Sequence, residues 1–187
     1  MTEANKALVY LALTGVFWST GGVLIKWVDW HPMAIAGIRS IIAAVIMWLA
    51  FRKDTFVISK RQIGGAIAYC CMLCLFVTSN KLTTAANAIL LQYTAPVYVA
   101  LLGGWLLAER PTRRDWVTIL LIFSGIIFFF MDKITPGGMV GNLCAILSGV
   151  SYAVFTVFMR LQKGGSPYVT VLLGNLLTFA VSIFFLP

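Results

Sequence analysis

Arg39 is the one charged side chain that lies well inside a long apolar stretch of this 187-residue chain. An arginine deep in a bilayer costs about 2.5–3.5 kcal/mol on insertion scales, so we expect it to face protein or water. Its planar guanidinium could bind a carboxylate through two parallel hydrogen bonds. A structural arginine that reaches toward the membrane surface, or binds free backbone carbonyls, explains the residue equally well.

Other polar and aromatic residues in apolar stretches could form a binding site with Arg39. Trp18 and Tyr152 could each offer an aromatic face to a ligand, and stacking of aromatic rings contributes roughly 0.5–1.5 kcal/mol. Asn175 is a further candidate for a cavity wall. The alternative for the two aromatic residues is that they fill a crossing between helices.

A helix break is expected at Pro96, in the middle of another apolar stretch. The proline ring clashes with the carbonyl of Gln92 and removes one backbone donor, so the helix should kink there. The freed carbonyl and the side chains of Gln92 and Tyr93 would place hydrogen-bonding groups near the membrane midplane. Interrupted helices are tolerated at that depth where they line a cavity. A kink that only serves packing is the alternative.

Residue types needed for catalysis or metal binding are sparse. The four cysteines are expected to be ordinary small residues at helix contacts, and the single histidine, His31, lies in a loop. All six acidic residues fall at ends or in loops: Glu3, Asp29, Asp54, Glu109, Asp115 and Asp132. No mid-membrane carboxylate is therefore available to exchange a proton for a cationic substrate. We expect no catalytic residue, metal or cofactor, and hence no enzyme.

The apolar stretches that hold these residues are long enough to cross a membrane. Hydrophobic residues make up 60% of the chain and charged residues 11%, with a mean hydropathy of +0.94. A spanning helix needs roughly 20 apolar residues. Seven stretches approach or reach that length: Ala7–Trp27, Pro32–Phe51, Gln62–Leu82, Ala85–Leu107, Trp116–Met131, Met139–Leu161 and Pro167–Pro187. The predicted fold is an all-α polytopic integral membrane protein with seven transmembrane helices.

Basic residues predict how these helices are oriented. Ten lie on one side of the expected spans: Lys6, Arg52, Lys53, Lys60, Arg61, Arg110, Arg113, Arg114, Arg160 and Lys163. The other side holds Lys26, Lys81 and Lys133. The positive-inside rule then places the N-terminus in the cytoplasm. The same asymmetry explains the net charge of +8 without nucleic-acid binding, which we do not expect.

An internal repeat relates the first and sixth predicted spans. Shifted by 134 residues, the segment 13–18 (LTGVFW) aligns with 147–152 (LSGVSY), and Lys26 aligns with Arg160. Five spans separate the two copies, so the second enters the membrane from the opposite side. Inverted repeats of this kind are typical of secondary transporters. Residues 1–135 are therefore expected to form a five-helix repeat, and residues 136–187 the first two helices of an inverted, incomplete second repeat.

Several segments together resemble the EamA family of the drug/metabolite transporter superfamily. They are 15–26 (GVFWSTGGVLIK) with Pro32 and Arg39, 85–96 (AANAILLQYTAP), 107–111 (LAERP) and 124–127 (SGII). The resemblance covers essentially the whole chain. It implies ten helices in two inverted five-helix repeats, both termini in the cytoplasm, and transport of small metabolites such as amino acids and aromatic compounds. The sequence lacks the last three helices of that pattern, which suggests a piece of a longer protein.

The sequence thus predicts a secondary transporter of the cytoplasmic (inner) membrane that works by alternating access. Its substrate would be an amino acid or related anionic or zwitterionic metabolite, with or without an aromatic part. The residues expected to bind it are Trp18, Arg39, Gln92, Tyr93, Tyr152 and Asn175. Spans one, two, four, six and seven would line the cavity. Expected partners are the substrate and the lipid bilayer, with a homodimer left open. A non-transporting assembly subunit is the main alternative, and a membrane enzyme a weaker one.

Overall fold

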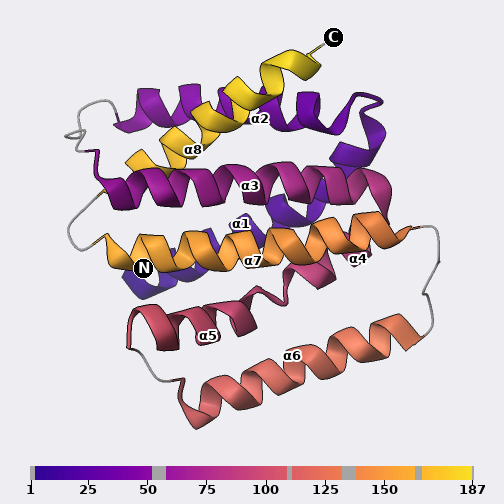
Figure 1. Cartoon of the computed structure of the whole chain (residues 1–187), viewed down its shortest axis with the longest axis vertical. Helices are drawn as coiled ribbons and strands as arrows, with labels where there is room; N and C mark the ends of the chain where they lie inside the picture. The colour runs from indigo at the N-terminus through magenta and orange to yellow at the C-terminus, as the bar shows by residue number, and fades with distance from the viewer. Residues whose placement is uncertain (1–2, 52–57, 109–110, 132–137, 163–165, 187) are drawn as a thin grey trace.

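The computed structural model describes residues 3–51, 58–108, 111–131, 138–162 and 166–186. All regular structure in these residues is helical (Figure 1). The elements are α1 (Glu3–Trp27), α2 (Pro32–Phe51), α3 (Lys60–Leu82), α4 (Ala85–Gln92), α5 (Ala95–Leu106), α6 (Arg113–Met131), α7 (Met139–Leu161), α8 (Pro167–Ser182) and the 3₁₀ turn η2 (Ile183–Phe185).

Six helical segments among the described residues are long and apolar enough to cross a membrane. They are Asn5–Trp27, Pro32–Phe51, Lys60–Leu82, Ala85–Leu106, Met139–Leu161 and Pro167–Phe185. The predicted fifth span is also a helix, α6, but it is not one of these six. A polytopic, all-helical membrane protein agrees with the prediction, whereas the seventh crossing stays a prediction. The expected repeat boundary at residues 135–136 lies outside the described residues.

The helices α3 and α6 begin at capping residues that precede their apolar part. The Ser59 hydroxyl accepts a hydrogen bond from the Gln62 amide, and the Gln62 side chain accepts one from the Ser59 amide (2.8 Å). This reciprocal pair satisfies amide donors that the first turn of α3 leaves free. At α6, the Asp115 carboxylate accepts from the Thr112 amide (2.7 Å), and the Asp115 amide donates to the Thr112 hydroxyl (3.3 Å). Both caps place polar side chains at one end of the helix layer.

The antiparallel pair α3 and α7 forms the middle of the molecule (Figure 1). At one end the Arg61 side chain donates to the Leu161 carbonyl (2.7 Å). At the other end a Cβ atom on Gly141 would lie 2.8 Å from the backbone of Leu82. Only glycine permits that approach, because any side chain would displace the facing backbone. The close packing fixes the register in which polar groups of α3 and α7 meet.

The pair α2 and α8 is also antiparallel and packs on one side of α3. A Cβ atom on Gly37 would lie 2.5 Å from Cβ of Ser182, and the rings of Phe51 and Tyr168 lie 4.9 Å apart. The core of this contact contains Ala44, Val169 and Leu172, with Met47 packed against it. Small residues near one end and larger ones near the other keep the helices in contact along much of their length.

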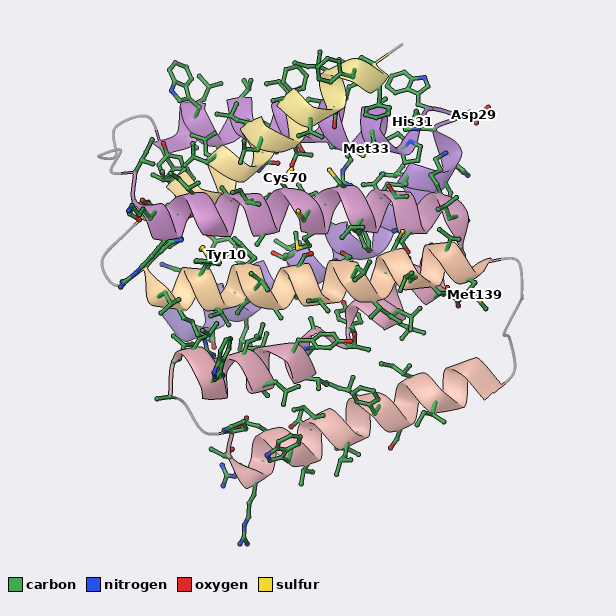
Figure 2. The ribbon with its side chains drawn as sticks, in the orientation of Figure 1. Tyr10, Asp29, His31, Met33, Cys70 and Met139 are labelled. Carbon is green, nitrogen blue, oxygen red and sulfur yellow. The ribbon has the colours of Figure 1, made fainter. Side chains whose placement is uncertain are left out.

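The helix α1 lies apart from this core. It is the least buried of the six candidate spans, and it touches α3 and α4, where Gly22 packs near Asn80 and Ala85. Lys81 donates a hydrogen bond to the Val28 carbonyl, just past the end of α1. Figure 2 shows Asp29, His31 and Met139 at this same end of the molecule, opposite the end that holds Ser59 and Leu161.

Candidate functional site

A cavity among the described residues lies between α5, α6 and α7. Its volume is about 410 Å³, which is within the range of small-molecule sites. Its lining consists of Pro96, Val99, Ala100 and Gly103 from α5, Asp115, Thr118 and Ile119 from α6, Tyr152, Thr156 and Arg160 from α7, and Pro111. Of the predicted site residues, Pro96 and Tyr152 therefore face the same space.

Charges of opposite sign lie in the wall of this cavity. Asp115 and Arg160 are both exposed, in the first turn of α6 and the last turn of α7. The Thr112 amide and hydroxyl both donate to the Asp115 carboxylate and hold its pKa below the usual range, because they stabilise the charged form. A carboxylate that stays ionised and an arginine can bind the ammonium and carboxylate groups of one zwitterion. The Tyr152 ring adds an aromatic surface deeper in α7.

The predicted break in the fourth span lies just before Pro96. The first segment, α4, ends at Gln92, and α5 begins at Ala95 with the proline in its first turn. The Thr94 hydroxyl donates to the Leu91 carbonyl (2.7 Å), which supplies a partner to a backbone group near the interruption. Tyr93 lies at the break and is 51% exposed. The break therefore places the polar residues Gln92, Tyr93 and Thr94 at the junction of the two helical segments.

One of these groups, the Gln92 side chain, binds α7 instead of an open cavity. Its amide donates to the Ser148 hydroxyl (2.9 Å), and Ser148 donates to the Met72 carbonyl on α3 (3.0 Å). Ser148 is fully buried. Next to it, a Cβ atom on Gly149 would lie 3.0 Å from the Gln92 carbonyl. Gln92 at the break thus contacts α7 at Ser148 and Gly149, and Ser148 connects this contact to α3.

Arg39 and Asn175 meet at a second, smaller cavity between α2, α3 and α8. Its volume is about 90 Å³, and Tyr69 and Ser40 also line it. Asn175 is buried and donates to the Val171 carbonyl of its own helix (2.9 Å). Arg39 as a whole residue is exposed, although it lines this cavity. This cavity holds a few atoms at most, too little for a whole metabolite.

Five of the predicted residues are therefore distributed over three places. Arg39 and Asn175 share the small cavity, Pro96 and Tyr152 share the large one, and Gln92 belongs to the contact between α4, α3 and α7. Trp18 lies in α1, and its side chain is outside the described residues.

Sequence reasoning missed Asp115, Arg160 and Tyr69 as lining residues, and the fifth predicted span as a wall. The alignment of Lys26 with Arg160 was the signal that could have drawn attention to Arg160.

The model of the EamA-like transporter family matches residues 5–131, which is more than half of the chain. The chain belongs to the EamA-like transporter family. It is therefore an integral membrane protein of a family of membrane transporters.

Relatives of this EamA-like chain carry transporter names. "Uncharacterized transporter YetK" of Bacillus subtilis is 24% identical over 81% of the chain and 49% of its own length. "Uncharacterized transporter" of Archaeoglobus fulgidus is 30% identical over 82% of the chain and 57% of its own length. The chain spans about half the length of the curated relatives it matches. No solved structure matched it.

Proposed function

We propose that this EamA-like protein carries a small zwitterionic metabolite, such as an amino acid, across the cytoplasmic membrane. The cavity between α5, α6 and α7 is the observation that carries the proposal, because Asp115 and Arg160 stand in its wall with Tyr152. Asp115 would bind the ammonium group and Arg160 the carboxylate, through charge-assisted hydrogen bonds. Tyr152 would contact an apolar or aromatic side chain of the substrate.

Transport by alternating access between two inverted five-helix repeats would use this cavity on one side of the membrane at a time. In the expected repeat, α2 and α8 are the second helices of the two copies. They pack against each other in antiparallel directions, which supports that architecture. The family match ends at residue 131, close to the expected boundary of the first repeat. With the N-terminus in the cytoplasm, the cavity with Arg160 would open to the cytoplasmic side.

Arg39 would act at a different depth. It lies toward the opposite end of the layer from Arg160, and it is the charged residue within the second candidate span. In our proposal it binds the substrate carboxylate in another step of the cycle, after the helices around the 90 Å³ cavity have moved apart. Asn175 would assist it there. Trp18, Gln92 and Tyr93 stay proposed contacts of the same pathway.

Ligand-induced thermal stabilisation of the purified protein tests the proposal. A panel would compare each amino acid with its decarboxylated amine and its N-acetyl derivative, which lack one of the two charges. At a concentration of 100 Kd, a ligand stabilises the folded state by about 2.7 kcal/mol. We expect stabilisation by at least one amino acid and none by its two derivatives.

Variants of Arg160 link such binding to the cavity. Arg160→Gln removes a charge-assisted hydrogen bond worth about 1.5–3 kcal/mol, so affinity should fall roughly 10- to 100-fold. Arg113→Gln, at the same end of the molecule but outside the cavity lining, is the matched control and should bind normally. Equal binding by Arg160→Gln and the wild type, or equal binding of amines and amino acids, would overturn the proposal.

A further inference from the structure

The small cavity between α2, α3 and α8 is lined by residues that donate hydrogen bonds. Its polar lining residues are Arg39, Ser40, Tyr69 and Asn175. The other four lining residues are apolar, and no carboxylate is among them. A guanidinium offers five N–H donors and no acceptor, and each hydroxyl offers one further donor. The lining therefore suits a ligand that accepts hydrogen bonds and carries a negative charge.

The Arg39 side chain has no counter-charge in the described part of the chain. Among those residues the structure records neither a hydrogen bond nor an ion pair for its guanidinium, and its charge interacts with the neutral side chain of Tyr69. An arginine remains charged in proteins, and a charge within a membrane span is costly unless it is paired. A bound anion would supply the missing partner.

The Tyr69 side chain is held in place beside this cavity. Its ring centroid lies 5.1 Å from that of Phe155 on α7, and a Cβ atom on Gly174 of α8 would lie 2.6 Å from its Cδ1 atom. Its hydroxyl is hydrogen-bonded to the side chain of Asn175, which also donates to the Val171 carbonyl (2.9 Å). A donor that is already fixed binds an ion more tightly, because less side-chain freedom is lost on binding.

The volume of the cavity limits what this anion can be. One water molecule needs roughly 10–15 Å³ of cavity, so about 90 Å³ has room for a monatomic ion with a few waters. Sites for whole metabolites are larger, roughly 300–1,000 Å³. Sulfate would bring four oxygen atoms and a second negative charge, whereas the lining provides one cation, Arg39. Size and charge together favour chloride.

We propose that this cavity is a chloride site, in which Arg39, Ser40 and Tyr69 donate hydrogen bonds to one ion. The chloride would neutralise Arg39 while α2, α3 and α8 are packed together. Its binding does not require the substrate of the proposed function. In the proposed cycle, chloride would leave Arg39 before a substrate carboxylate binds there, and this exchange is the part of the inference that rests on the proposed function.

Binding of radioactive chloride to the complete purified protein tests the site. The protein would be held on scintillation beads in detergent, without any amino acid, and titrated at constant ionic strength in gluconate buffer. We expect saturable binding of one chloride per chain, with competition by bromide and little by sulfate. Arg39→Gln removes a charge-assisted hydrogen bond and should weaken binding roughly 10- to 100-fold. Tyr69→Phe removes a neutral one and should weaken it roughly 2- to 10-fold.

A surface arginine provides the matched control. Arg113 is exposed at the start of α6 and does not line this cavity, so Arg113→Gln should bind chloride as the wild type does. If Arg39→Gln does not fold, Arg39→Lys replaces it, and it should bind more weakly than the wild type because lysine lacks the planar fork.

Three results would each overturn the chloride site. They are a wild type without saturable chloride binding, an Arg39→Gln variant that binds as well as the wild type, and sulfate that competes as well as bromide. A protein that binds chloride but no amino acid would instead refute only the proposed substrate.

Discussion

Removing the Ser148 hydroxyl should destabilise the contact between α3, α4 and α7. Ser148 is fully buried, accepts a hydrogen bond from Gln92 (2.9 Å) and donates one to Met72 (3.0 Å). Interhelical hydrogen bonds in membrane proteins average about 0.6 kcal/mol each, and a buried donor left without its partner costs about 1–3 kcal/mol. The free energy of unfolding of Ser148→Ala should therefore fall by about 1–3 kcal/mol.

This loss can be measured as a shift in thermal unfolding of the detergent-purified protein. For a chain of this size, 1 kcal/mol corresponds to about 2–4 °C, so we expect a fall of about 2–12 °C. Ser124→Ala is the matched control, because the Ser124 hydroxyl binds the Leu120 carbonyl of its own helix (2.9 Å). It should shift the unfolding temperature little.

A double-mutant cycle with Gln92→Leu then isolates the pair. If Ser148→Ala unfolds at the same temperature as Ser124→Ala, and the cycle shows no coupling, the contact does not stabilise the fold as we argue.

Three further predictions concern single positions. Gly141→Ala should lower stability by about 1–3 kcal/mol, because its Cβ would lie 2.8 Å from the Leu82 backbone; thermal unfolding measures it. Asp115 has a lowered pKa through its bonds to Thr112. The stability that its carboxylate adds to the start of α6 should therefore be present above the unfolded-state pKa and be lost as pH falls through the folded-state pKa. Hydrogen exchange of the first amides of α6 measures this loss, and Asp115→Asn should show no such pH dependence. Ala108 has a left-handed φ of 54°, so Ala108→Gly should raise the unfolding temperature, since alanine is strained there by roughly 1–2 kcal/mol.

Apolar length predicted the interior of the helices better than their ends. The predicted bounds Pro32–Phe51 and Met139–Leu161 agree with α2 and α7. In contrast, α3 begins two residues before the predicted Gln62, and α6 three residues before Trp116. Hydrogen bonds of capping side chains set both starts, and those residues are polar. A search for capping patterns such as serine followed three residues later by glutamine would have found the first.

The candidate site depends on which helices pack side by side, and the sequence alone does not show these contacts between helices. Arg160 was explained by membrane orientation alone, since its sequence neighbours do not show that α5 and α6 stand beside it. Arg39 was noticed because a charge in lipid is costly, but nothing in the sequence distinguishes its neighbour Tyr69 on α3 from other residues of that helix. Gln92 was expected to face a cavity, and its partner Ser148 comes from a helix 56 residues away in the chain.

Counterflow of amino acids in proteoliposomes tests the central claim most directly. Vesicles that contain the protein and are loaded with one unlabelled amino acid would be placed in a trace of the same compound carrying a radioactive label. We predict accumulation of label for at least one zwitterionic amino acid, its loss in Arg160→Gln, and its retention in Arg113→Gln. Label that stays at the level of protein-free vesicles for every amino acid, or that Arg160→Gln leaves unchanged, would contradict transport through the cavity between α5, α6 and α7.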